Sequence, residues 1–156
     1  MRLRFLWIGK TRDSQYSQLE YKYLGRLRQF IPSEITVLPE LKKTDRRQQA
    51  AQMEREARLI EEKLTPDCFL VILSDTGKQY SSRELSSQLE GLMIQGISEV
   101  TFLIGGHLGI PERIRQMADS NWSLSKLTFP HELARIVLLE QVYRALTIIR
   151  GLPYHK

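Results

Sequence analysis

Hydrophobic residues in this chain gather in short runs, which alternate with longer segments where they recur every three or four positions. The runs predict β-strands, and the recurring positions predict helices with one apolar face. Strands are predicted at Leu3–Ile8, Ile35–Leu38, Phe69–Leu73, Val100–Ile104 and Trp122–Leu124. Helices are predicted at Tyr16–Phe30, Asp45–Leu64, Ser82–Gln95, Pro111–Ala118 and His131–Ile149. This alternation predicts an α/β fold in which a mostly parallel sheet is flanked by helices on both faces.

Local signals mark the ends and faces of the predicted helices. Ser81 and Glu84 have the spacing of a capping box at the start of the third helix. Pro111 suits the first turn of the fourth helix. The second helix has one apolar stripe at helical spacing, formed by Met53, Ala57, Ile60 and Leu64.

The last predicted helix, His131–Ile149, is hydrophobic around nearly its whole circumference. A helix of this kind must be buried on every side. The sheet can cover one side, so we expect a second subunit to cover the other, which predicts a homodimer. The alternative is a central core helix within one chain. Glu140 and Arg144 stand four positions apart on this helix, in the order that favours an ion pair.

Length and composition indicate one domain that spans residues 1–156. The chain is 42% hydrophobic and 26% charged, which suits a single globular core. No uncharged apolar run approaches the roughly 18 residues of a membrane span, and the apolar run Phe5–Ile8 is too short for a signal peptide. The single cysteine, Cys68, excludes an internal disulfide and a CxxC motif. We therefore expect a cytoplasmic protein that has no membrane partner.

The formal net charge of +5 is concentrated in the first part of the chain. Residues 1–63 hold 14 Lys or Arg against 9 Asp or Glu, whereas residues 64–156 hold 9 of each. A basic surface of this kind is typical of proteins that bind a phosphate backbone. A solvated basic face without a ligand is the alternative.

Three of the nine glycines lie within the five positions 105–109, directly after a predicted strand. A dinucleotide-binding turn needs the order GxGxxG, and a P-loop needs Gly-Lys-Ser/Thr, and neither is present here. Open α/β sheets bind ligands beyond the carboxyl ends of their strands. The glycines therefore indicate either a pocket lined by backbone groups or a tight turn without a ligand.

Several segments resemble the ribosomal large-subunit methyltransferase H family, a minimal branch of the SPOUT methyltransferases. They occur in the family's order over nearly the full length of the chain: IGK (8–10), LSDTGKQYSS (73–82), FLIGGHLG (102–109), WSLSKLTFPHELAR (122–135), LEQVYRA (139–145) and PYHK (153–156). The chain departs from the family at Gly25, within a predicted helix, while His107 stands at a variable position. Neither residue belongs to the motifs that define the resemblance.

The resemblance implies an S-adenosylmethionine-dependent methyltransferase that acts on N3 of a pseudouridine, position 1915, in the 23S rRNA of the assembled ribosome. It implies a homodimer whose chain forms a C-terminal trefoil knot, with the basic part at 1–63 and the cofactor-binding part at about 70–156. The family's cofactor contacts correspond to Leu73, Gly105, Leu124, Ser125, Lys126, Leu127, Thr128 and Phe129.

Four side chains are candidates for the catalytic site under this resemblance: Glu140, Arg144, Tyr154 and His155. The N3 proton must leave during methyl transfer, and a nearby base or a cation would favour that step. His107, His131 and His155 are too scattered to form a metal site, and methyl transfer needs no metal.

Two other classes of function remain open from the residues. A noncatalytic RNA- or ribosome-binding module would keep the fold and the basic face. A nucleotide-dependent oxidoreductase would need a different order of glycines from the one present.

Overall fold

The computed structural model describes residues 1–41 and 46–155. Its centre is a sheet of five parallel strands: β1 (Arg2–Ile8), β2 (Ser33–Leu38), β3 (Phe69–Gln79), β4 (Glu99–Ile104) and β5 (Ser120–Ser123). The strands lie in the order β2-β1-β4-β3-β5, and every pair is parallel. The prediction of an α/β fold with a mostly parallel sheet is confirmed.

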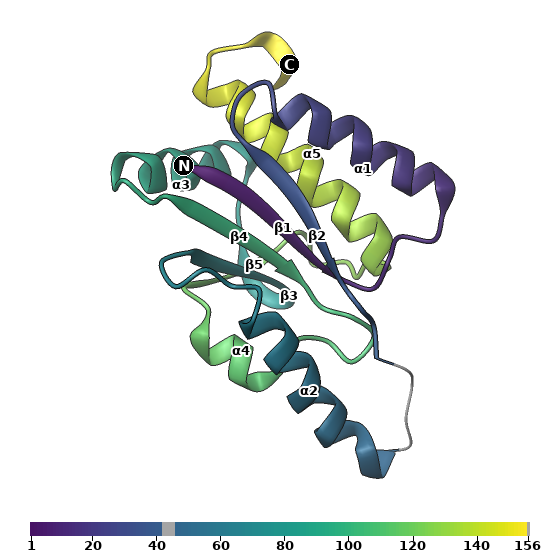
Figure 1. Ribbon diagram of the computed structural model, residues 1–156. Helices are drawn as coiled ribbons and strands as arrows, with labels where there is room; N and C mark the ends of the chain where they lie inside the picture. Colours follow the sequence, from purple (N-terminus) through teal and green to yellow (C-terminus); the bar gives the residue numbers. More distant parts are fainter. Residues whose placement is uncertain (42–45, 156) are drawn as a thin grey trace.

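Helices cover both faces of this sheet (Figure 1). They are α1 (Ser14–Leu27), α2 (Gln49–Glu61), α3 (Ser82–Ile94), α4 (Glu112–Met117) and α5 (His131–Ile149), with short 3₁₀ helices η1 (Arg46–Gln48) and η2 (Pro153–His155). The helices α1, α3 and α5 lie on one face, and α2 and α4 lie on the other. The sheet is therefore the middle layer of three.

The strands of the sheet are hydrophobic on both faces because helices cover both. In β1, Leu3, Phe5 and Trp7 belong to the core beneath α1, α3 and α5. The alternate residues Leu6 and Ile8 belong to the smaller core beneath α2 and α4. This alternation explains why the run is hydrophobic at successive positions.

Several boundaries differ from those predicted by the hydrophobic pattern. Helix α1 begins at Ser14 because the Asp13 side chain caps it, accepting hydrogen bonds from the backbone N–H groups of Gln15 and Tyr16. Strand β3 continues past Leu73 to Gln79, with a register shift against β5. The predicted start of α2 at Asp45 lies outside the described residues.

The predicted capping box is confirmed. The Ser81 hydroxyl accepts a hydrogen bond from the backbone N–H of Glu84 at 3.2 Å, and the Glu84 carboxylate accepts one from the backbone N–H of Ser81 at 2.7 Å. Pro111 stands one position before α4, at its N-cap, rather than inside the first turn.

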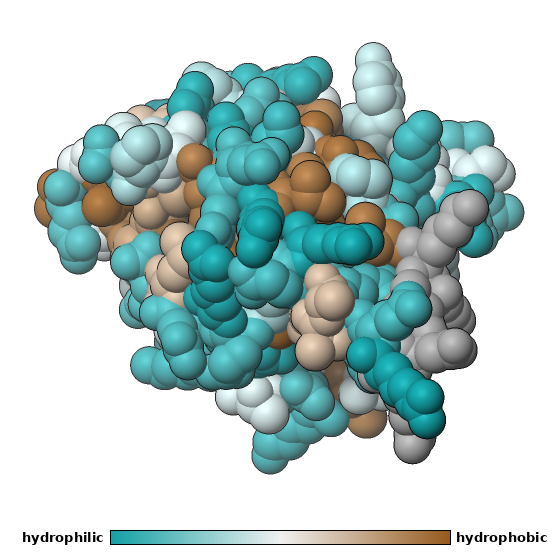
Figure 2. Space-filling model, turned by 60° about the horizontal axis from the view of Figure 1, so that its bottom comes forward, coloured by the Kyte–Doolittle hydropathy of each residue, from teal (hydrophilic) through white to brown (hydrophobic). Residues whose placement is uncertain are grey.

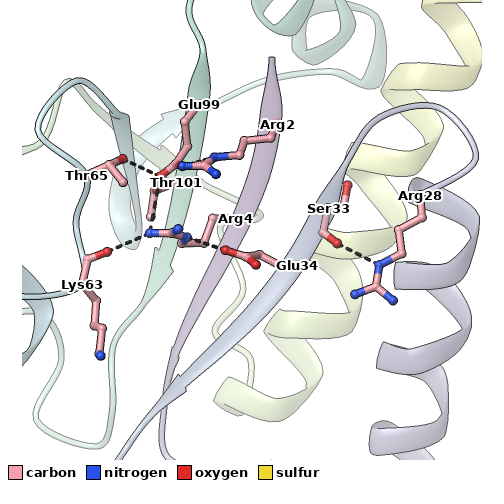
Figure 3. Close-up of polar contacts among 9 residues, drawn as sticks. All are labelled: Arg2, Arg4, Arg28, Ser33, Glu34, Lys63, Thr65, Glu99 and Thr101. Carbon is pink, nitrogen blue, oxygen red and sulfur yellow. Dashed lines mark hydrogen bonds and ion pairs between the residues drawn. The ribbon is translucent and has the colours of Figure 1, made fainter.

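A buried polar cluster joins the amino ends of β1 and β4 (Figure 3). The Glu99 side chain is only 2% exposed and lies between Arg2 and Arg4, with Arg4 Nη1 at 3.6 Å. Its Oε1 also accepts hydrogen bonds from the hydroxyls of Thr65, at 2.7 Å, and Thr101, at 3.0 Å. Burial alone would raise the pKa of Glu99, but these hydrogen bonds lower it below its usual range.

The surface carries mostly hydrophilic side chains on the face shown in Figure 2, with hydrophobic residues in separate patches. Within the described ranges, every helix is too short or too polar to cross a membrane. The most hydrophobic helix, α5, lies inside the chain rather than on its surface.

Helix α5 is covered by the sheet and by its neighbours α1 and α3 (Figure 1). Leu138, Leu139 and Val142 are fully buried in one chain. The expectation that a second subunit is needed to bury the helix is therefore wrong for most of its circumference. A stripe of half-buried residues remains, and the homodimer stays a prediction: Leu133, Val137, Glu140, Gln141, Arg144 and Ile148.

Candidate functional site

A cavity of about 470 Å³ lies where β3, β4 and β5 end, beside the first turn of α5. Its walls come from the segment after Leu73, the glycine loop after Ile104 and the connection from β5 to α5. Seven of the eight residues predicted to contact the cofactor line it: Leu73, Gly105, Leu124, Ser125, Leu127, Thr128 and Phe129. Lys126 is exposed and is not part of the lining.

The glycine loop is a tight turn packed against itself. Gly106 and Gly109 form a bridge, in which the N–H of Gly109 donates to the carbonyl of Gly106 at 3.0 Å. Gly109 has a φ of +80°, which favours glycine. A Cβ added at Gly105 would lie 2.5 Å from the Gly109 carbonyl oxygen. Gly105 is therefore required first by contact with its own loop, and a larger side chain there would displace the loop.

The connection after β5 is held by hydroxyl groups. The Ser123 hydroxyl donates to the Ser125 carbonyl at 2.9 Å, and the Ser125 hydroxyl accepts from the N–H of Leu127 at 3.0 Å. A second close approach fixes this edge of the sheet, because a Cβ on Gly77 would lie 2.5 Å from the Trp122 carbonyl oxygen. The wall of the cavity is thus set by backbone contacts between β3 and β5.

The lining suits S-adenosylmethionine in size and chemistry. The volume falls in the range of roughly 300–1,000 Å³ that is usual for small-molecule sites. Leu73, Ile104 and Phe129 offer apolar surface for a purine, while the loop backbones offer hydrogen-bonding groups. Asp75 and Arg115 also line the cavity and were not predicted. The position of Asp75, two residues after a predicted strand, was the available signal.

The candidate catalytic residues form a separate cluster at the carboxyl end of α5. Arg144 donates to Oε1 of Glu140 at 2.6 Å, and the Tyr154 hydroxyl donates to the same oxygen at 3.2 Å. The Arg144 guanidinium also lies 5.0 Å from the centre of the Tyr154 ring. The predicted ion pair is present. The side chain of His155 lies outside the described part of the chain.

The environment of Tyr154 keeps its hydroxyl protonated. Burial, a hydrogen bond with Tyr23 and the nearby Glu140 carboxylate raise the pKa of Tyr154 to about 12. The ring packs edge-on against Tyr143, with centroids 4.8 Å apart. At neutral pH this side chain can donate a proton in a hydrogen bond but does not act as a base.

The cavity and the tail cluster lie at opposite ends of α5 (Figure 1). Ala134 lines the cavity, whereas Arg144 stands ten residues further along the helix, which is about 15 Å at 1.5 Å per residue. One chain therefore does not bring the candidate catalytic residues to its own cavity. In the described ranges, His, Cys, Asp and Glu side chains form no group of three suited to a metal ion.

Comparison with known proteins places this arrangement in a family. The model described as "Predicted SPOUT methyltransferase" matches residues 1–155. A protein named ribosomal RNA large subunit methyltransferase H from Parabacteroides distasonis is 36% identical over 155 residues, covering 99% of both chains. One with the same name from Streptococcus uberis is 38% identical over 159 residues, covering 100% of both.

A solved structure shows the same fold at low sequence identity. A methylase family protein from Haemophilus influenzae Rd KW20 superposes with a TM-score of 0.58 at 12% identity, over 99% of this chain and 70% of the other. The match over the full length, together with the shared parallel sheet, shows that the chain belongs to the SPOUT methyltransferases, in the family of ribosomal RNA large subunit methyltransferase H.

Proposed function

We propose that this protein transfers a methyl group from S-adenosylmethionine to N3 of the pseudouridine at position 1915 of 23S rRNA, in the assembled ribosome. Its relatives are named for a large-subunit ribosomal RNA methyltransferase. The observation that carries the proposal is the cavity at the ends of β3, β4 and β5, since it gathers seven of the eight expected cofactor contacts. We place the protein in the cytoplasm, where ribosomes are found.

S-adenosylmethionine supplies an electrophilic methyl group, so the protein's main work is to bind and align the reacting atoms. Leu73, Gly105 and the segment 124–129 would hold the cofactor through apolar surface and backbone groups. The N3 proton has to leave. Tyr154 stays protonated and Glu140 is engaged by Arg144, so the cation of Arg144 would favour the N3 anion. His155 remains our candidate for the proton acceptor.

We further propose that a homodimer completes the site. The tail cluster and the cavity are too far apart to meet in one chain, whereas the tail of a second chain can approach the cavity. The half-buried stripe on α5, which includes Leu133 and Val137, leaves surface for that second chain. Each active site would then combine the cavity of one chain with the tail of the other.

The activity is tested by incubating the protein with labelled S-adenosylmethionine and ribosomes that lack the modification, and then mapping the methylated nucleotide. Label on N3 of the expected pseudouridine supports the proposal. Cofactor binding without label in any RNA would contradict it and favour the noncatalytic ribosome-binding module.

Mixed dimers test whether the site is shared. A chain with Gly105→Val in the cavity is combined with a chain that lacks residues 154–156. In a shared site, the intact cavity of the second chain meets the intact tail of the first, so one site in each mixed dimer is active. If each site belongs to one chain, the mixed dimer is as inactive as its two parents.

A further inference from the structure

A second cavity of about 480 Å³ adjoins the cofactor cavity, and His107 and His131 line both. Its other walls are the turn after β1, the residues after β2 and the first two turns of α5. Three cationic side chains line it: Lys10, Arg12 and Arg135. None of the candidate cofactor or tail residues takes part, so this cavity has no role in the site described above.

The two carboxylates in the wall already have partners. Glu132 accepts hydrogen bonds from the backbone N–H groups of Arg12, at 2.9 Å, and Asp13, at 3.2 Å, and these lower the pKa of Glu132. Glu40 lies 3.0 Å from Nδ1 of His107. Lys10 is exposed and forms no ion pair within the described residues. Positive charge in the cavity is therefore only partly neutralised.

Arg135 is the least solvated of these cations, at 1% exposure. Its Nη1 donates to the Thr11 hydroxyl at 2.9 Å, and its Nη2 donates to the Ile8 carbonyl at 2.7 Å. Among the described residues, its Nε has no hydrogen-bond partner, and no carboxylate lies within ion-pair distance. A buried cation without an anion is unfavourable, so a bound anion would stabilise this arrangement.

We propose that the second cavity binds a backbone phosphate of the RNA substrate, next to the nucleotide that is methylated. Because His107 and His131 line both cavities, a phosphate held by Lys10, Arg12 and Arg135 would lie beside the methyl donor. Arginine and lysine are the side chains that bind phosphate groups in nucleic-acid complexes. The inference rests on the proposed function, because it assigns part of the substrate to a place in the same site.

The carboxylate of the bound cofactor is another anion that could reach this cavity, so the test has to separate the two sources. Lys10→Ala and Arg12→Ala each remove one cation from the wall. Arg83→Ala is the matched control, since it removes one exposed charge from α3, outside both cavities. Arg135 is left intact because its hydrogen bonds to Thr11 and Ile8 hold the fold together.

Two affinities are measured for each variant: S-adenosylmethionine by calorimetry, and unmodified ribosomes by equilibrium binding at several salt concentrations. We expect Lys10→Ala and Arg12→Ala to lower ribosome affinity about tenfold and to flatten its salt dependence by about 0.7 in log–log slope per lost contact. Their cofactor affinity should match that of Arg83→Ala. Ribosome affinity equal to the control overturns the inference, and so does a loss of cofactor affinity, which would assign the cavity to the cofactor.

Glu40→Gln tests the same inference in the opposite direction, because it removes a negative charge from the wall while keeping a group that can hydrogen-bond to His107. Ribosome affinity should rise about threefold, and a fall would contradict a phosphate site. The outcomes also separate this inference from the proposed function. If the unaltered protein methylates ribosomes but the variants bind them normally, only the cavity assignment fails. If it neither binds nor methylates them, both fail.

Discussion

The Tyr154 hydroxyl donates a hydrogen bond to Oε1 of Glu140 at a distance of 3.2 Å, across the joint between the tail and α5. Arg144 donates to the same oxygen, and the Tyr154 ring packs edge-on against Tyr143. These contacts give the last residues of the described chain a defined position. They also make the ionisation of Tyr154 a measure of whether the tail is docked.

We predict that tail docking is lost between pH 10 and 12. Tyr154 has a folded pKa of about 12 against an ordinary value of 10.0. Because the folded pKa is the higher one, the stabilisation is fully present below pH 10 and disappears as the pH rises through 12. Ultraviolet difference absorbance between the protein and Tyr154→Phe measures this titration. A Tyr154 signal that titrates near 10 would show that the tail is undocked.

Deleting residues 154–156 should affect the rate of methyl transfer far more than stability. The deletion removes one aromatic pair, worth about 0.5–1.5 kcal/mol, and one hydrogen bond of about 0.5–1.5 kcal/mol. The rate at saturating ribosome should fall by about 10²–10⁴, the usual range for loss of a proton-transfer group. Chemical unfolding and single-turnover kinetics measure the two effects. A full rate would remove Tyr154 and His155 from the site.

Two glycine substitutions should have opposite effects on stability. Gly105→Ala places a Cβ against the Gly109 carbonyl, so it should distort the loop and weaken cofactor binding at least tenfold. Gly91→Ala, within α3, meets no atom within 4 Å and should stabilise the protein by about 0.5–1 kcal/mol. Thermal melts with and without S-adenosylmethionine measure both. Normal cofactor affinity in Gly105→Ala would mean that the loop shape is not needed for binding.

Glu99→Gln should destabilise the fold without touching the cofactor cavity. It weakens charged hydrogen bonds with Arg2, Thr65 and Thr101, at a cost of about 1.5–3 kcal/mol. The folded pKa of Glu99 is lowered, so its contribution is present above about pH 4.5 and is lost as the pH falls through the folded pKa.

The free energy of unfolding, measured from pH 7 to 3, should therefore depend less steeply on pH in Glu99→Gln than in the parent protein. Glu34→Gln is a suitable control, because Glu34 pairs with Arg4 in the same region but its side chain is 50% exposed. Equal losses in the two variants would mean that burial of Glu99 adds nothing to its ion pairs.

The sequence was sufficient to predict the strand and helix types, because each buried run and each apolar stripe leaves a period that burial imposes. It did not predict the extension of β3 through residues 74–79, because Ser, Asp, Thr, Gly and Lys carry no hydrophobic pattern there. The hold on this extension is the approach of Gly77 to Trp122, which is a contact between backbones far apart in sequence.

The candidate site was predictable only in part for a similar reason. Glycines and short polar residues after strands predict the cofactor loops, since parallel strands share an edge for their carboxyl ends. The position of the tail depends on the length and direction of α5, and the hydrophobic period of a helix gives neither its direction nor its partner. Lys42 and Lys43, which we expected among the RNA-binding residues, lie outside the described residues, while Arg47 is exposed.

The pairing of β1 with β4 sets a condition on when the protein becomes competent during its own synthesis. Arg2 pairs with Glu99, so the first strand made has no neighbour on that side until nearly two thirds of the chain exists. The cofactor cavity further requires β5 and the start of α5. Binding of S-adenosylmethionine should therefore appear late and all at once in refolding, which makes it a reporter of complete assembly rather than of an early intermediate.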